Sequence, residues 1–403
     1  NDSITTGDGN HFVIGGFGSD IITTGVGTDT LLGDNGSLVF NAAGLMVRAD
    51  SSVDTNASGG NDTVTSLAGD KTVIGGVGSD TITVGNGNGV FIGDNGTVTL
   101  DATGQMLQSI ESTGYLAGLG GNDSITTGDG NHFVIGGFGD DLIDTGNGFD
   151  ILFGDNGLVA FNAAGVATTV ESHDDVALSA GNDNITASDG VKYVVGGYGN
   201  DVIKLGDGDN IIFGDSGRIL IDAAGTVRSV VSINVSVGGD DQVVTGDGRN
   251  VVIGGVGNDT LSAGDGGNVM LGDSGQVTRD ATGAYVEVVT THPNLGGNDQ
   301  IMGGSGADIL IGGNGRDELF GYNGFNVVIG DSGQVFYLNG TVLQAQTIDL
   351  YAGADDILHG GDNLSLLFGG AGSDLFYGSF NTDVMIGDYG SATFTGDKIT
   401  SVV

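Results

Sequence analysis

The sequence contains no cysteine and no tryptophan, and only one proline among 403 residues. Without cysteine the chain has neither disulfides nor thiol chemistry, so its stability does not depend on redox state. Glutamate is also scarce, since only four of the 51 acidic residues are Glu and the other 47 are Asp. Asp bonds to nearby backbone in turns whereas Glu favours helices, so this imbalance favours turns. No apolar run approaches the roughly 18 residues of a membrane helix, and we expect no membrane insertion.

Glycine, in contrast, makes up 82 of the 403 residues and recurs every two to five positions. Because Gly costs about 1 kcal/mol in a helix interior relative to Ala, this spacing excludes long helices. Collagen is also excluded, because the glycines do not follow a strict triplet and proline is nearly absent. The structure that remains compatible with this composition is a set of short strands joined by turns.

Basic residues are few, and the net charge is −41. Such a charge repels nucleic acid and anionic bilayers and opposes compaction of the chain. Disorder does not fit, because 38% of the residues are hydrophobic. We therefore expect a folded chain that binds many cations and no nucleic acid.

The sequence repeats every 57 to 61 residues, as two independent anchors show. One is Gly-Asp-x-Gly and the other is usually Gly-Asn-Asp, and both occur seven times with the same six spacings. Residues 1–18 are identical to residues 122–139. Because fixed periods of this kind indicate repeat architectures, we expect one continuous array, part of a longer one, with repeats at 1–59, 60–120, 121–180, 181–238, 239–296, 297–353 and 354–403.

Each repeat contains a shorter period of nine, with an apolar residue two positions after each turn residue. Residues 15–23 match the pattern G-G-x-G-x-D-x-U-x, where U is apolar, and the match recurs at 75–83, 136–144, 196–204, 254–262, 312–320 and 369–377. At these residues the chain closely resembles the RTX (repeats-in-toxin) nonapeptide family. The resemblance covers roughly the first 36 residues of every repeat. It implies an all-β fold, a right-handed parallel β-roll (β-solenoid) in which two nonapeptides make one turn and turns 18 residues apart stack and share Ca²⁺.

The chemistry of these turns favours calcium in its own right. Glycines let the turn adopt positive φ and point carbonyls inward, while the closing Asp adds a carboxylate, so hard oxygen ligands converge. If every carboxylate only capped its turn, Asp would rarely be needed each time. We expect calcium ligands along one edge of the roll, here called the aspartate edge: Asp2, Asp20, Asp62, Asp80, Asp123, Asp141, Asp183, Asp201, Asp241, Asp259, Asp299, Asp317, Asp356 and Asp374.

The Gly-Asp-x-Gly turns stack on the same edge and offer further expected ligands, namely Asp34, Asp94, Asp155, Asp215, Asp273, Asp331 and Asp388.

The closing positions of the other edge, here called the opposite edge, are mixed. They are His11, Asp29, Lys71, Gly89, His132, Asp150, Lys192, Asn210, Asn250, Asn268, Asp308, Asn326, Ser365 and Asp383. We expect calcium to fill this edge only in places, at Asp29, Asp150, Asp308 and Asp383. Lys71 and Lys192 either place an ammonium where an ion would otherwise sit or are solvated turn residues.

The strands differ in polarity. Odd strands hold one apolar residue between polar neighbours, as at residues 81–83, whereas even strands are apolar throughout, as at residues 12–14. Continuous apolar runs indicate burial on both faces. The remainder of each repeat alternates and turns at a Gly, as at residues 41–44, which predicts a β-hairpin. We expect these hairpins to cover the even-strand sheet, with self-association through that sheet as the alternative. A seven-bladed propeller is a rival fold, but the nine-residue spacing argues against it.

Catalysis finds little support, because no nucleophile motif or metal-spaced His pair occurs. The Asp pairs occur seven times, whereas a catalytic site is single, so we expect no enzyme. The favoured function is a calcium-binding structural segment of a secreted bacterial cell-surface, adhesive, filament or surface-layer protein that folds and rigidifies on extracellular Ca²⁺. The resemblance implies type I secretion as an unfolded chain. The alternatives are a non-catalytic C-terminal module of a secreted enzyme or toxin, and an ice- or polysaccharide-binding face on Thr rows such as Thr5 and Thr23.

Overall fold

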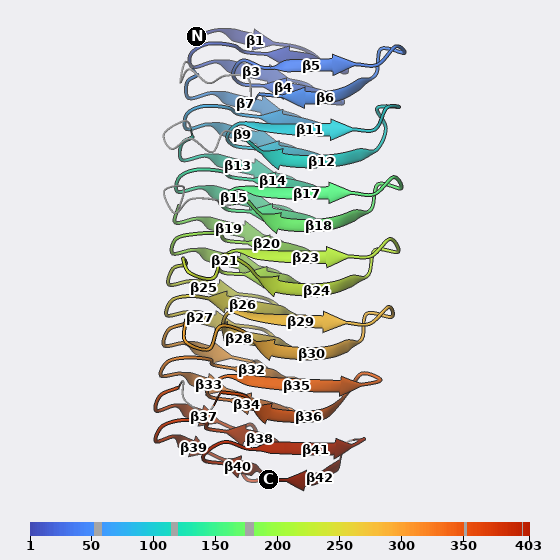
Figure 1. Ribbon diagram of the computed structural model, residues 1–403. Helices are drawn as coiled ribbons and strands as arrows, with labels where there is room; N and C mark the ends of the chain where they lie inside the picture. Colours follow the sequence, from blue (N-terminus) through green and yellow to red (C-terminus); the bar gives the residue numbers. More distant parts are fainter. Residues whose placement is uncertain (52–58, 114–119, 174–180, 350–352, 397) are drawn as a thin grey trace. The chain divides into compact units, whose positions relative to one another are not determined.

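The computed structural model describes residues 1–51, 59–113, 120–173, 181–349, 353–396 and 398–403. These residues form 42 β-strands and no helix, which confirms the predicted all-β class. Accordingly, the described chain offers no helix with the length and apolarity needed to cross a bilayer. The chain divides into two compact units: unit 1 comprises residues 1–198 and 223–225, and unit 2 comprises residues 199–222 and 226–403. Figure 1 shows the order of the strands along the chain.

Glycine geometry explains why the strands are so short. In the turn of residues 15–20, Gly16 and Gly18 have φ values of 108° and 87°. L-residues with a side chain rarely adopt such angles, so the chain must turn there. Because such turns recur every nine residues, only three to five residues remain for each strand of the roll.

Unit 1 contains two parallel sheets and one antiparallel sheet. The strands of sheet A, in spatial order, are β1 (Ser3–Thr5), β3 (Ile21–Thr24), β7 (Thr63–Ser66), β9 (Thr81–Val84), β13 (Ser124–Thr127), β15 (Leu142–Thr145) and β19 (Asn184–Ala187). Those of sheet B are β2 (Phe12–Ile14), β4 (Asp29–Leu32), β8 (Lys71–Ile74), β10 (Gly89–Ile92), β14 (His132–Ile135), β16 (Asp150–Phe153) and β20 (Lys192–Val195). Sheet C consists of the hairpins β5 (Ser37–Phe40) with β6 (Met46–Asp50), β11 (Gly96–Leu100) with β12 (Leu107–Ser112), and β17 (Gly157–Phe161) with β18 (Ala167–Ser172).

Unit 2 repeats this arrangement. Its sheet A strands are β21 (Val202–Leu205), β25 (Gln242–Val244), β27 (Thr260–Ser262), β31 (Gln300–Met302), β33 (Glu318–Phe320), β37 (Ile357–His359) and β39 (Leu375–Tyr377). Its sheet B strands are β22 (Ile211–Phe213), β26 (Val251–Gly255), β28 (Val269–Asp273), β32 (Ile309–Ile311), β34 (Asn326–Ile329), β38 (Ser365–Phe368) and β40 (Val384–Ile386). Its hairpins are β23 (Gly217–Ile221) with β24 (Val227–Ser232), β29 (Gly275–Arg279) with β30 (Tyr285–Thr290), β35 (Gly333–Leu338) with β36 (Thr341–Thr347), and β41 (Ser391–Thr395) with β42 (Lys398–Val402).

The register places equivalent residues on top of one another. Ile4 pairs with Ile22 in sheet A, and Val13 pairs with Leu31 in sheet B, in both cases 18 residues apart. Between repeats the hairpin is looped out, so that Ile22 pairs with Val64. Two nonapeptides therefore make one turn of a parallel β-roll, as predicted. Parallel pairing excludes the antiparallel blades of a propeller.

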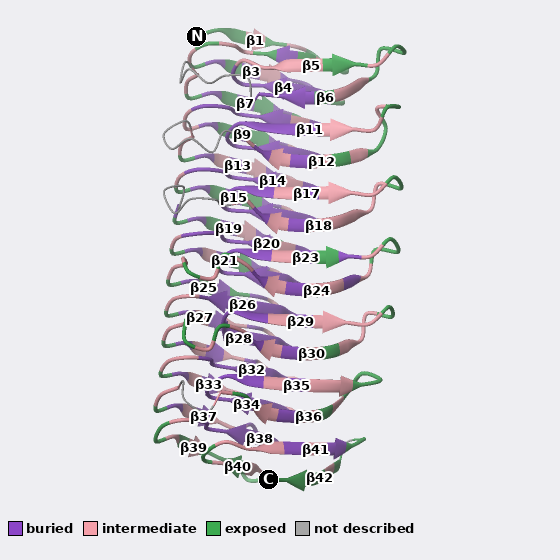
Figure 2. Ribbon diagram, viewed as in Figure 1, coloured by how far each residue is buried: buried purple, intermediate pink, exposed green. Residues whose placement is uncertain are grey.

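The polarity of the strands matches their position. In β9 the threonines face solvent while Ile82 and Val84 are buried, whereas all four residues of β10 are buried. Figure 2 colours the residues of the strands by burial. Hairpins cover the outer face of sheet B, because the Phe12 and Phe40 rings meet edge to face at 5.0 Å, and Phe133 meets Phe161 at 5.3 Å. The predicted hairpins thus bury this apolar face, and no partner is needed to explain its composition.

Each predicted repeat range contains six strands, two from each kind of sheet. The expected boundary after residue 180 lies outside the described residues.

Candidate metal-binding edges

A ladder of hydrogen bonds from main-chain N–H groups to aspartate side chains holds the aspartate edge in register. In unit 1, the Asp20 N–H donates to Oδ1 of Asp62 at 2.6 Å, and the Asp62 N–H donates to Oδ1 of Asp80 at 2.7 Å. Unit 2 repeats the pattern, with Asp241 N–H to Asp259 Oδ1 at 2.8 Å. Each carboxylate therefore fastens one turn to the next through one of its two oxygens.

The second oxygen of these carboxylates has no hydrogen-bond partner, although it is buried. This holds in unit 1 for Oδ2 of Asp20, Asp62, Asp80, Asp123 and Asp141, and in unit 2 for Oδ2 of Asp241, Asp259, Asp299, Asp317, Asp356 and Asp374. Leaving a buried carboxylate oxygen unpaired is costly. A row of such atoms is what a set of bound cations would satisfy.

Main-chain carbonyls converge on the same places, above the glycine that begins each turn. A Cβ built on Gly75 would lie 2.3 Å from Oδ2 of Asp80 and 2.2 Å from the Gly93 carbonyl oxygen. A Cβ on Gly312 would likewise lie 2.3 Å from Oδ2 of Asp317 and 2.2 Å from the Gly330 oxygen. A carboxylate from one turn and a carbonyl from the next therefore share a space that only glycine leaves open.

The donor set fits calcium. The Gly93 oxygen already accepts the Gly76 N–H at 2.9 Å, so one lone pair remains for a cation. No three His, Cys, Asp or Glu side chains within the described ranges gather closely enough to hold a metal alone. A cation at this edge would therefore take carboxylate and carbonyl oxygens together, which is the mixture that Ca²⁺ prefers.

Burial also makes these carboxyl groups hard to ionise. Burial, reinforced by repulsion from neighbouring carboxylates, raises the pKa of Asp80 to about 9. Burial likewise raises the pKa of Asp62 to about 7 and that of Asp356 to about 8. The ladder thus needs either protons or positive charge at neutral pH.

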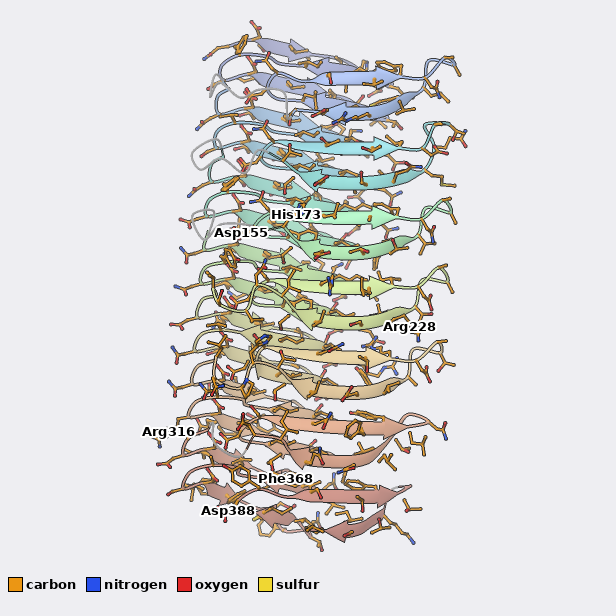
Figure 3. The ribbon with its side chains drawn as sticks, in the orientation of Figure 1. Asp155, His173, Arg228, Arg316, Phe368 and Asp388 are labelled. Carbon is orange, nitrogen blue, oxygen red and sulfur yellow. The ribbon has the colours of Figure 1, made fainter. Side chains whose placement is uncertain are left out.

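The Gly-Asp-x-Gly aspartates are bonded differently, because both oxygens accept main-chain N–H groups. Oδ1 of Asp155, labelled in Figure 3, accepts the Gly181 N–H at 3.3 Å, and its Oδ2 accepts the Tyr198 N–H at 2.6 Å. The same pair of bonds occurs at Asp34, Asp94, Asp215, Asp273 and Asp331, whereas Asp388 is exposed. In this arrangement the series ties the end of a hairpin segment back to the roll.

On the opposite edge of unit 1, a lysine and a histidine of the chain itself contact each of two aspartates. The Lys192 ammonium lies 2.9 Å from Oδ2 of Asp150, and His132 Nδ1 lies 2.9 Å from its Oδ1. The ammonium also donates to the Gly148 and Asp189 carbonyl oxygens, at 2.7 and 3.1 Å. Burial opposes ionisation of Asp150, but the bonds from His132 and Lys192 outweigh it and lower the pKa of this carboxyl group. The ammonium thus binds the carboxylate-plus-carbonyl set that a metal would use.

The second such cluster is built alike from His11, Asp29 and Lys71. His11 Nδ1 lies 3.0 Å from Oδ1 of Asp29, and the Lys71 ammonium lies 3.5 Å from its Oδ2. Lys71 is 2% exposed and Lys192 is fully buried, so neither is a solvated turn residue. The sequence places both histidines at closing positions of turns, and their bond to Asp was not predicted. The signal was present as a His–Asp pair 18 residues apart.

In unit 2, neutral amides replace these charges on the opposite edge. Asn210 Nδ2 donates to Oδ1 of Asn250, and Asn250 Nδ2 donates to Oδ1 of Asn268, both at 3.1 Å. Asp308 interrupts this ladder; its Oδ2 is buried without a hydrogen-bond partner, and burial raises its pKa to about 7. Asp383 accepts main-chain N–H groups at both oxygens. Of the four aspartates expected to bind calcium on this edge, Asp308 is therefore the one whose carboxylate most resembles those of the aspartate edge.

Comparison with known families agrees with this geometry. The sequence matches the family model described as RTX calcium-binding nonapeptide repeat (4 copies), over residues 5–37, 56–97, 114–143, 135–157, 193–218, 236–276, 295–333 and 350–385. No curated protein matches the chain. The matched segments span more than half of the sequence and contain most turns of the aspartate edge.

Proposed function

The chain belongs to the RTX calcium-binding nonapeptide repeat family, and on that premise we propose that it is a structural segment of a secreted bacterial cell-surface protein that folds and rigidifies on extracellular Ca²⁺. The observation that carries the proposal is the row of buried, unpaired Oδ2 atoms facing the carbonyl oxygens of the next turn. Adhesive, filament and surface-layer roles all use such a segment as a stiff spacer. The sequence repeats seven times without a distinct centre, and we propose no reaction for it.

We propose that multiple calcium ions lie along the aspartate edge, held by the 14 aspartates named in the sequence analysis, with one further ion at Asp308. Asp80 with the Gly93 carbonyl, and Asp317 with the Gly330 carbonyl, represent the two units. Each ion would supply the positive charge that lets stacked carboxylates ionise together. The chain's own contribution is to hold carboxylate and carbonyl oxygens in register through the Oδ1 ladder.

Two other groups of aspartates have different roles in this proposal. We assign the Asp34 series to capping turns, because each of its oxygens accepts a main-chain N–H group and neither is left unpaired, unlike Oδ2 of the aspartate edge. Asp29 and Asp150 bind Lys71 and Lys192 in place of calcium. Unit 1 would therefore depend on calcium at one edge and on its own side chains at the other.

The alternative is a non-catalytic module of a secreted enzyme or toxin, for which the flanking sequence of the gene is the test. Self-association stays a prediction.

Circular dichroism combined with light scattering tests both folding and assembly. The chain is stripped of calcium with EGTA and titrated with Ca²⁺ up to 10 mM, a range that includes the affinities of extracellular modules. We expect a cooperative gain of β signal. Constant scattering favours a spacer and rising scattering favours a filament or lattice. Full β structure in EGTA at about pH 8 would refute calcium-driven folding.

A substitution sharpens this test. Asp80→Asn removes a charge and an unpaired oxygen from the aspartate edge, so the midpoint of the calcium titration should move to higher Ca²⁺ by roughly tenfold, as for other changes at metal sites. Asp144→Asn is the matched control, because Asp144 lies exposed in β15. Equal midpoints for the two variants would argue against the ligand role of Asp80.

A further inference from the structure

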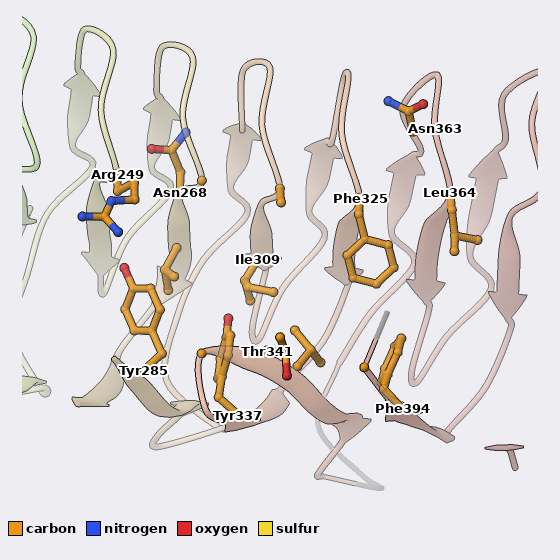
Figure 4. Close-up of a pocket in the computed structure, with 16 residues that line it drawn as sticks. Arg249, Asn268, Tyr285, Ile309, Phe325, Tyr337, Thr341, Asn363, Leu364 and Phe394 are labelled. Carbon is orange, nitrogen blue, oxygen red and sulfur yellow. The ribbon is translucent and has the colours of Figure 1, made fainter. Parts of the chain in front are cut away.

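Unit 2 contains a pocket of about 730 Å³ between the turns of sheet B and the hairpins of sheet C. Figure 4 shows Ile309 and Phe325 on the roll side, and Tyr285, Tyr337 and Phe394 on the hairpin side. The volume lies within the range of pockets that hold small organic ligands, and such pockets are mostly apolar with a few polar groups.

The pocket exists because two successive turns lack a large side chain. We compare the residue that directly precedes each opposite-edge closing position, in four turns that lead into neighbouring strands of sheet B. In chain order these residues are Arg249, Gly267, Ala307 and Phe325. In unit 1 one of the seven equivalent positions holds Phe149, whose ring packs edge-on against Tyr193 at 5.2 Å, and the other six hold Asn, Thr, Asp or Val. Gly267 and Ala307 leave that space open.

The backbone does not require glycine at position 267. Gly267 is not among the residues with positive φ, and a Cβ added there would meet only the Ala307 carbonyl oxygen, at 3.3 Å. A larger residue would therefore fit the turn with a small adjustment and would fill the pocket. The open space therefore results from the small side chains at positions 267 and 307 and not from the geometry of the turn.

The lining is mostly apolar and aromatic, with polar groups from Asn268, Thr341, Asn363 and the two tyrosines. The Phe325 and Phe394 rings meet edge to face at 5.9 Å, and the Tyr285 and Tyr337 rings lie 5.5 Å apart. Figure 4 shows Tyr337 with its hydroxyl directed into the pocket. Burial raises the pKa of Tyr337, so the hydroxyl stays neutral and can donate a hydrogen bond.

The rim is positively charged, in a chain with only ten Lys and Arg against 51 acidic residues. The Arg249 side chain is 73% exposed and pairs with Asp209 at 3.0 Å. The Arg279 guanidinium lies 4.8 Å from the centre of the Tyr285 ring, and its Nε is buried without a hydrogen-bond partner. Arg279 lines a small adjoining hollow together with Arg249 and Tyr285. Two guanidinium groups thus face one carboxylate at the mouth of an apolar pocket.

We propose that this pocket binds an organic anion with an apolar body. The apolar body would lie among Ile309, Phe325 and Phe394, and the anionic group would lie at Arg249 and Arg279. Apolar walls with few donors disfavour a sugar, and the rim disfavours a cation. The pocket lies away from the aspartate edge but borders Asp308, because Ala307 and Ile309 both line it. Binding is therefore tested on the calcium-loaded chain.

Isothermal titration calorimetry with decanoate, and with decanol as the neutral match, tests the proposal. We expect decanoate to bind more tightly than decanol. Gly267→Phe, which installs the residue found at the equivalent position 149, should abolish binding of both. Thr28→Phe adds the same ring at the same turn position in unit 1, where the side chain is exposed, and should leave binding unchanged.

Arg249→Gln separates charge from shape. It should weaken decanoate binding by about tenfold, the usual value of a charged hydrogen bond, and leave decanol binding unchanged. Circular dichroism in Ca²⁺ checks that each variant keeps its β signal. Equal affinity for decanoate and decanol would overturn the anion assignment, and undiminished binding by Gly267→Phe would overturn the pocket itself.

Discussion

A single aspartate in the aspartate edge has two separate tasks. Oδ1 of Asp80 accepts the Asp62 N–H and fastens the neighbouring turn, while Oδ2 faces the carbonyl of the turn beyond. Asn could reproduce the first task with its amide oxygen but not the second with its nitrogen. This division explains why every position of the aspartate edge is Asp, whereas the opposite edge accepts His, Lys, Asn and Ser.

Gly75→Ala tests whether the space above the first glycine is needed. The added methyl group would meet Asp80 Oδ2 at 2.3 Å and the Gly93 oxygen at 2.2 Å, where we place an ion. We expect the calcium midpoint to rise and the calcium-loaded chain to lose about 1–3 kcal/mol of stability, the usual cost of overpacking. Gly7→Ala is the control, because nothing lies within 4 Å of a Cβ there. Identical thermal unfolding of the two variants in Ca²⁺ would show that the space is not used.

At the scale of the element, no strand of the roll is stable alone, because each is only three to five residues long. Sheet A presents a polar face to solvent, whereas sheet B is buried between the roll interior and the hairpins. The turns decide how strands join. On the opposite edge of unit 1, a buried ammonium group connects successive turns. In unit 2, hydrogen bonds between Asn side chains connect them.

Lys71→Met tests the internal ammonium. It leaves the Asp29 carboxylate buried without its cation, and breaking a buried pair in this way typically costs about 3–5 kcal/mol. Urea unfolding in saturating Ca²⁺ measures the loss. The control is Lys204→Met, since Lys204 is exposed in β21. A loss no larger than that of the control would mean that the ammonium does not hold this edge together.

For the whole molecule, the raised pKa values predict a dependence on pH that calcium reverses. In the ion-free fold, burial raises the pKa of Asp299 to about 7 and that of Asp80 to about 9, above the ordinary value of 3.8. The folded chain then binds more protons than the unfolded chain between roughly pH 4 and 9, so its stability falls as pH rises. In calcium-free buffer we expect the β signal to be strongest near pH 4–5 and to be lost towards pH 8.

With Ca²⁺ present the trend should be the opposite, because the ion requires ionised carboxylates. Circular dichroism across this pH range makes the comparison, on chain freed of calcium beforehand and kept in calcium-free buffer, and on the same chain with added Ca²⁺. A β signal in calcium-free buffer that grows with pH would contradict the assignment.

Much of this organisation could be predicted from sequence, because a strict period fixes which residues stack. The nine-residue rhythm gave the strands, the 18-residue stacking of Asp62 and Asp80, and the hairpins. The bond of Lys71 to Asp29 could not be derived fully, because their stacking depends on how the hairpin between them is looped out. The capping role of Asp34 and the pocket at Gly267 were missed for the same reason: each depends on contacts between segments that no local pattern records.

The most direct test of calcium at the aspartate edge is a crystal structure of the calcium-loaded chain with anomalous scattering from Ca²⁺. We predict anomalous peaks between successive turns of the aspartate edge, within bonding distance of Oδ2 of Asp80 and its counterparts, and none beside Lys71 or Lys192. An aspartate edge without peaks, or peaks at the two lysine positions, would contradict this prediction.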